Sequence, residues 1–159
     1  KNAASSTGWL LALWAVGSAV AAIINGAIKF QSAHATRFLI YLVGLTLGTV
    51  PLLFVDSIAV LAVALFVNGL FIAPLIVNAY GTVENAVPAG QITEALTWVI
   101  AGMPLGAAIS SALAGIIIDN AGARSAFWVP LGFMFAAMVA TLPYLSTYRA
   151  AIGYAQPRD

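Results

Sequence analysis

The chain has 159 residues, of which 62% are hydrophobic and 7% are charged, and its formal net charge is +1. A typical soluble domain has about a quarter charged residues, and a small soluble core could not hide so much apolar surface. A membrane protein is therefore expected. The low net charge argues against a nucleic-acid partner, which needs a basic face. The absence of cysteine excludes disulfides and cysteine-ligated metal sites.

The first apolar stretch, about residues 8–28, is long enough to cross a bilayer. Trp9 and Trp14 stand near its start, where indole rings favour the membrane interface. Asn25 lies close to its far end, just before Lys29. Asn25 is a candidate substrate-lining residue, although this place near the helix end also suits capping or an interface role.

The second span covers about residues 37–55 and follows a loop that contains His34, the only histidine. Its Gly44-x-x-x-Gly48 pair favours close helix packing, and Pro51 predicts a kink in its last turns. Only Asp56 and Ser57 separate it from the next apolar stretch. We therefore expect spans two and three to form a tight antiparallel hairpin.

The third span, about residues 58–83, contains a stripe of residues at i, i+3, i+7 and i+10, which lie on one face of a helix. The stripe consists of Asn68, Phe71, Leu75 and Asn78. Because an amide in hydrocarbon needs a partner, this face should meet protein or a water-filled cavity. Substrate lining and interhelical hydrogen bonding explain the two asparagines equally well.

The fourth span, about residues 95–118, has no charged side chain and carries small residues on two adjacent faces. In lipid such faces let helix backbones pack closely, so we predict a central packing helix. The small residues proposed for packing are Gly102, Gly106, Ser110, Ser111 and Gly115. A polar turn follows, in which Asp119 and Arg124 could form a local ion pair, and a fifth span covers about residues 125–145.

Five spans place the two ends of the chain on opposite sides of the membrane. One side collects Lys29, Arg37, Arg149 and Arg158, and the other collects Lys1 and Arg124. The excess of bases on the first side predicts that it is cytoplasmic, with the N-terminus outside. The candidate loop or gating charges are Lys29, Arg37, Glu84, Glu94, Asp119 and Arg124.

Charged side chains inside spans would indicate ion or proton relays, and none lies in the interior of the predicted spans. The sequence also lacks the H-E-x-x-H, G-x-S-x-G and phosphate-loop motifs of soluble enzymes. We therefore expect no enzymatic activity, catalytic residue, metal site or cofactor.

The glycine-rich fourth span, the D-x-x-G-x-R turn at 119–124 and a fifth span that opens with Phe127 resemble a half-repeat of major facilitator transporters. Residues 69–90 look like the span and cytoplasmic loop that precede this helix in the family's second half. The resemblance covers nearly the whole chain. It implies that the five spans correspond to the last five of the six spans in the C-terminal half.

The resemblance implies an all-α, polytopic bundle of five transmembrane helices, a single bundle over residues 1–159 in the plasma (inner) membrane. The expected function is part of a secondary active transporter, an exporter of a small neutral or amphipathic molecule that works by alternating access. Its expected partners are the bilayer, the substrate and the remainder of the transporter, which is the N-terminal half and one span. The alternative is a small complete membrane subunit or scaffold that packs against a partner membrane protein.

Overall fold

A computed structural model describes the backbone of residues 2–28, 33–55 and 57–154, and the side chains of residues 7–28, 33–55 and 57–143. These residues form helices and connecting turns, with no strand among them. The elements are α1 (Asn2–Ala27), α2 (His34–Thr49), η1 (Val50–Leu53), α3 (Ile58–Gly69), α4 (Ile72–Ala86), η2 (Ala89–Gln91), α5 (Ile92–Ala121), η3 (Ala123–Phe127) and α6 (Trp128–Tyr154). The all-α fold class is confirmed.

In the described part of the chain, five helical stretches are long and apolar enough to cross a membrane. They are Thr7–Ala27, His34–Leu53, Ile58–Ala86, Ala89–Ala121 and Ala123–Pro143. The five long apolar helices expected from the sequence are thus present. His34, assigned to a loop by the sequence, is instead the first residue of α2.

The third span is broken where α3 ends at Gly69 and α4 begins at Ile72. Pro74 explains the break, because a proline has no N–H to bond the carbonyl four residues earlier and its ring collides with that carbonyl. The carbonyl in question belongs to Leu70, which lies in the break. Pro51 acts similarly at the end of α2, where the chain tightens into the 3-10 turn η1 instead of continuing as an α-helix.

Replacing Pro74 by alanine is expected to join α3 and α4, because the new N–H at position 74 can bond to the Leu70 carbonyl. One added backbone hydrogen bond stabilises by about 1 kcal/mol. Amide hydrogen exchange should show new protection around residues 70–74. Unchanged rapid exchange in this segment would mean that the helix contacts, and not Pro74, set the break.

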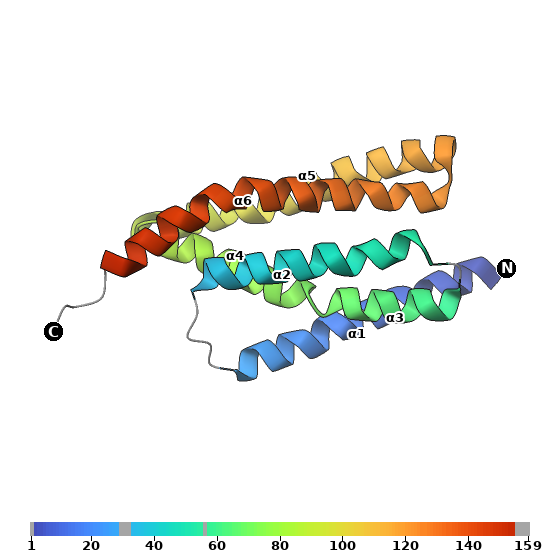
Figure 1. Ribbon diagram of the computed structural model, residues 1–159, viewed down its shortest axis with the longest axis horizontal. Coiled ribbons are helices and arrows are strands. Elements are labelled where there is room, and N and C mark those ends of the chain that lie inside the picture. Colours follow the sequence, from blue (N-terminus) through green and yellow to red (C-terminus); the bar gives the residue numbers. More distant parts are fainter. Residues whose placement is uncertain (1, 29–32, 56, 155–159) are drawn as a thin grey trace.

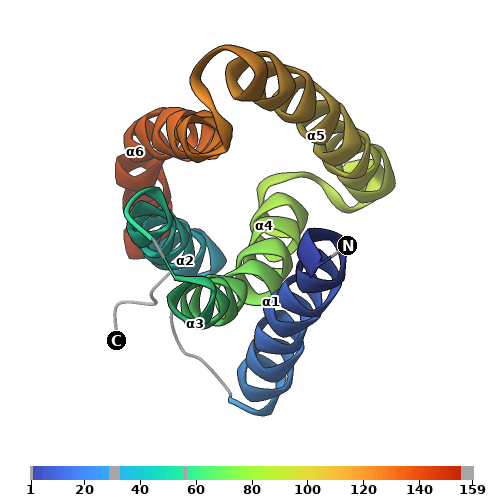
Figure 2. The same ribbon diagram turned by 90° about the vertical axis from the view of Figure 1, so that its right-hand side faces the viewer.

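The helices form three layers, with α1 and α3 in one, α2 and α4 in the middle, and α5 and α6 in the third (Figure 1). The end-on view gives the same arrangement (Figure 2). The start of α1, the start of α3 and the turn between α5 and α6 lie at one end of the molecule, whereas α6 finishes at the other (Figure 1). The broken span therefore has two partners, since α3 packs mainly on α1 and α4 mainly on α2.

Two glycines allow α1 and α3 to cross at backbone contact. A Cβ added at Gly17 would collide with the Phe66 carbonyl oxygen, and one added at Gly69 would collide with the Trp14 carbonyl oxygen. The two contacts are reciprocal, so neither helix can accept a side chain at its crossing residue without moving away. Close approach through small residues is the packing expected between helices in lipid.

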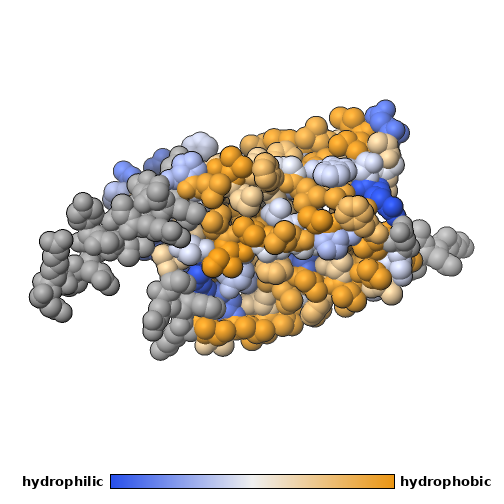
Figure 3. All heavy atoms as spheres, in the orientation of Figure 1, coloured by the Kyte–Doolittle hydropathy of each residue, from blue (hydrophilic) through white to orange (hydrophobic). Residues whose placement is uncertain are grey.

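The face of the bundle seen in Figure 3 is mostly apolar over its middle. Large side chains that a soluble protein would bury are exposed in this chain, including Ile23 and Phe54 at 73% each and Leu47 at 64%. Since lipid tails solvate such side chains, the exposed surface supports the membrane assignment.

The α5 helix lies at the edge of the bundle and has no buried residue among those the structure describes. A Cβ added at Gly102, Gly106 or Gly115 would meet nothing within 4 Å. Ser111 is exposed and Ser110 is partly exposed. Within the described chain α5 is therefore a peripheral helix and not the central one that the sequence predicted. Close packing of its small-residue face stays a prediction about a partner outside these residues.

Candidate functional site

The Asn68 side chain connects three helices near the middle of the bundle. Its amide oxygen accepts a hydrogen bond from the Trp14 indole at 3.2 Å. Its amide nitrogen donates to the Thr49 hydroxyl oxygen at 2.9 Å and lies 3.4 Å from the Leu45 carbonyl oxygen. Asn68 and Thr49 are 6% and 3% exposed. The polar groups of this cluster thus satisfy one another, as burial away from water requires.

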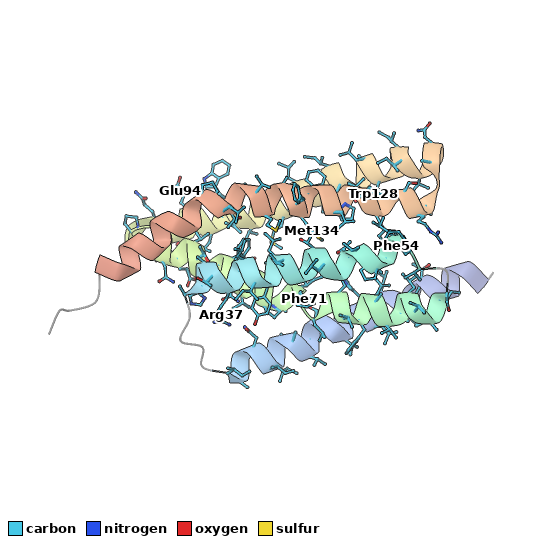
Figure 4. All side chains as sticks on the ribbon, viewed as in Figure 1. Arg37, Phe54, Phe71, Glu94, Trp128 and Met134 are labelled. Carbon is cyan, nitrogen blue, oxygen red and sulfur yellow. The ribbon has the colours of Figure 1, made fainter. Side chains whose placement is uncertain are left out.

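The Thr49 hydroxyl extends this cluster toward α6. It donates to the Leu45 carbonyl oxygen at 2.8 Å, and the sulfur of Met134 lies 3.7 Å away. Met134 projects from α6 toward α2 (Figure 4). Side chains from α1, α2, α3 and α6 therefore meet around one buried amide.

Asn78 is the most buried polar residue described, at 0% exposure. Its amide nitrogen donates to the Pro74 carbonyl oxygen at 2.7 Å, and its amide oxygen faces Nδ1 of His34 at 3.2 Å. Because the amide oxygen only accepts, this contact is a hydrogen bond in the tautomer that carries the proton on Nδ1 of His34. The imidazole lies directly against the backbone of α4, since a Cβ added at Gly81 would collide with its ring.

Asn25 lies at the boundary between α1 and α2. Its amide oxygen accepts hydrogen bonds from the Arg37 guanidinium at 2.6 Å and from the Tyr41 hydroxyl at 3.1 Å. Asn25 therefore joins the last turns of α1 to the first turns of α2. The Arg37, His34 and Asn78 side chains all lie at the end of the bundle where α2 begins.

The structure does not place the predicted stripe on one continuous helix, because Asn68 precedes the break and Phe71, Leu75 and Asn78 follow or lie within it. The Phe71 ring packs on α2, where a Cβ at Gly44 would collide with it, and Gly48 lies near both Phe71 and Asn68. Both amides are engaged between helices. In this conformation the geometry favours interhelical hydrogen bonding over direct substrate lining.

The charged residues that the structure describes lie toward the helix ends. Glu84 and Glu94 flank the α4–α5 connection, and Asp119 stands in the last turns of α5. Arg124 donates a hydrogen bond to the Val55 carbonyl oxygen at 3.2 Å, which ties the α5–α6 turn to the α2–α3 connection. Lys29 lies outside the described residues.

Sequence reasoning missed several members of these clusters. Trp14 was assigned to the membrane interface, but its indole reaches inward to Asn68. Thr49 and His34 were not proposed as partners of the asparagines. Each of them has a hydrogen-bonding side chain at about the same depth in the membrane as an asparagine on another span. This similarity in depth identifies a partner only if it is known which helices are neighbours.

Together these features define a polytopic all-α membrane protein whose polar groups are joined across helices. The family model of the Major Facilitator Superfamily matches residues 2–158, so the chain belongs to this family of membrane transporters. Its five apolar spans fit part of one half of such a transporter. Comparison with curated proteins and comparison with solved structures each gave no match.

Proposed function

We propose that this chain forms part of a secondary active transporter that exports a small neutral or amphipathic molecule by alternating access. In this mechanism two halves of the transporter rock about a site near the middle of the membrane. Membership of the Major Facilitator Superfamily supports the transport function. The remainder of the transporter, an N-terminal half and one further span, would supply the other walls of the pathway.

The chemistry of the described spans supports a neutral substrate. At the depth of the Asn68 cluster the polar groups are an amide, a hydroxyl and an indole, all without formal charge. A fixed charge at this depth would be expected for an ionic substrate or a proton relay. Any carboxylate that couples transport to protons is therefore proposed to lie outside this chain.

We propose a plasma (inner) membrane location with the Arg37 end of the bundle in the cytoplasm. That end carries Arg37 and His34, and basic residues are more frequent in cytoplasmic loops. The start of α1 would then lie outside and the end of α6 inside, because they occupy opposite ends of the molecule (Figure 1).

The transporter proposal is tested in the complete transporter with Asn68→Leu and Asn78→Leu. The measured quantity is the efflux of a lipophilic fluorescent dye from proteoliposomes per molecule of folded protein. Because both amides join helices, we expect less folded protein and little change in efflux per folded molecule. Asn85→Leu is the matched control, since Asn85 is exposed and bonds only to the Gly81 carbonyl of its own helix.

A loss of efflux per folded molecule in either variant, with normal folding, would instead support substrate lining by the asparagine replaced in that variant. If the complete, folded transporter moved none of a panel of neutral, cationic and anionic amphiphiles, the export proposal itself would be wrong.

The second candidate function is a complete small subunit or scaffold that docks on a partner membrane protein. The exposed small-residue face of α5 favours it, because such a face permits close packing with another helix. The intact mass of the polypeptide in its native membrane separates the two. A mass near 16.4 kDa supports the subunit, and a clearly larger mass supports the transporter.

A further inference from the structure

A surface groove lies where α4 passes into α5. It has a volume of about 320 Å³ and is lined by Val87, Gln91, Glu94, Ala95 and Trp98. The last four follow the i, i+3, i+4, i+7 spacing of one helix face, and Val87 closes the groove from the end of α4. Neither the proposed transport function nor the buried asparagine clusters use this groove.

The lining of the groove is acidic. Glu94 is its only ionisable side chain, and no Lys or Arg occurs in the sequence between Arg37 and Arg124. A carboxylate in the first turn of α5 complements the helix dipole, which explains its presence at a helix start. The dipole does not explain why an exposed indole lies one turn further along the same face.

Trp98 is 74% exposed although it is among the largest apolar side chains. An indole near a helix end is typical of the membrane interface, where lipid head groups lie. The face of an indole attracts an organic cation within about 6 Å, and a carboxylate one turn away adds a charge-assisted hydrogen bond. Beyond Trp98 the surface of α5 remains apolar, because Leu105 and Ile109 are exposed there. Such a surface is suited to contact with lipid acyl chains.

We propose that this groove binds the ammonium head group of an aminophospholipid such as phosphatidylethanolamine. The primary ammonium would bond to the Glu94 carboxylate over the Trp98 ring, the Gln91 amide would donate to the phosphate or ester oxygens, and the acyl chains would follow α5. The carboxylate and the lack of a basic lining residue disfavour an anionic lipid that has no ammonium group. Glu94 lies at the same end of the molecule as Arg37 (Figure 4). The assignment therefore places the lipid in the leaflet at that end.

The test uses the protein as purified from its membrane, in a maltoside detergent, with bound lipid counted by native mass spectrometry. Soluble dihexanoyl phosphatidylethanolamine is titrated against dihexanoyl phosphatidylglycerol. We expect the wild type to prefer phosphatidylethanolamine, Glu94→Gln to weaken its binding about tenfold, and Trp98→Leu to weaken it about threefold. The matched control is Glu84→Gln, which removes the other carboxylate of this connection without touching the groove and should leave binding unchanged.

Equal binding of the two lipids, or an equal loss with Glu84→Gln, would show that the groove does not recognise the head group and would overturn the proposal. Propylamine that binds as tightly as the lipid would identify a soluble organic cation as the ligand and overturn the lipid assignment. Glu94 and Trp98 are exposed, so the variants are expected to fold, and monodisperse elution checks this. The experiment requires no transport, so its outcome is independent of the proposed function.

Discussion

Replacing Gly69 by valine is expected to lower the free energy of unfolding by about 3 kcal/mol, at the upper end of the usual cost of overpacking. The Cβ at this position would occupy the space of the Trp14 carbonyl oxygen, and backbone cannot rotate away as a flexible side chain can. The helices α1 and α3 would have to separate over their whole crossing. Since Gly17 makes the reciprocal contact with Phe66, Gly17→Val should have a similar effect.

The measurement is thermal or denaturant unfolding of the detergent-solubilised protein, followed by circular dichroism. Gly26→Val serves as the control, because Gly26 lies on α1, as Gly17 does, and a Cβ there would meet nothing within 4 Å. If Gly26→Val destabilises as much as Gly69→Val, the effect comes from glycine loss in general, and the backbone contact at the α1–α3 crossing does not matter for stability.

The sequence predicts the number, type and approximate limits of the long helices well, because each apolar run must be long enough to cross the hydrocarbon. It predicts less about the break in the third span. Pro74 was visible within that span, but a proline can kink a helix or interrupt it. In this structure the helix is interrupted, and its two pieces pack on different neighbours, α3 on α1 and α4 on α2. These neighbours are not evident in a linear sequence.

The position of α5 shows a second limit. Its small residues indicate that a neighbour could approach closely, but composition does not specify which helix that neighbour is. The glycines that do make close contacts are Gly17, Gly44, Gly69 and Gly81, on other helices. Small-residue faces therefore predict the capacity for close packing and not its location within the chain.

The buried asparagines were correctly singled out as polar groups that need partners, whereas their partners were not predicted. Trp14 and Asn68 are 54 residues apart, and His34 and Asn78 are 44 apart. Depth in the membrane can be estimated by counting residues along each span, but the rotation of each helix about its axis cannot. The assignment of Trp14 to the interface relied on the distance to the helix start alone and did not anticipate its hydrogen bond to Asn68.

Replacing Asn68 by leucine is expected to lower the free energy of unfolding by about 1–3 kcal/mol, because it leaves buried polar partners without a hydrogen bond. Leucine has a similar volume, so the loss would report hydrogen bonding rather than a cavity. The Trp14 indole would lose its acceptor, and the Thr49 hydroxyl oxygen would lose its donor. Trp14→Phe removes the same hydrogen bond by deleting its donor instead of its acceptor.

A double-mutant cycle of Asn68→Leu with Trp14→Phe therefore isolates this bond. We expect a coupling free energy of about 0.5–1.5 kcal/mol, within the range measured for side chains in contact. Polar pairs between membrane helices average about 0.6 kcal/mol, because the unfolded helices also find partners in the membrane. A coupling near zero would mean that the Trp14 contact contributes nothing to holding α1 on α3. The reciprocal glycine contacts would then hold that helix pair by backbone packing alone.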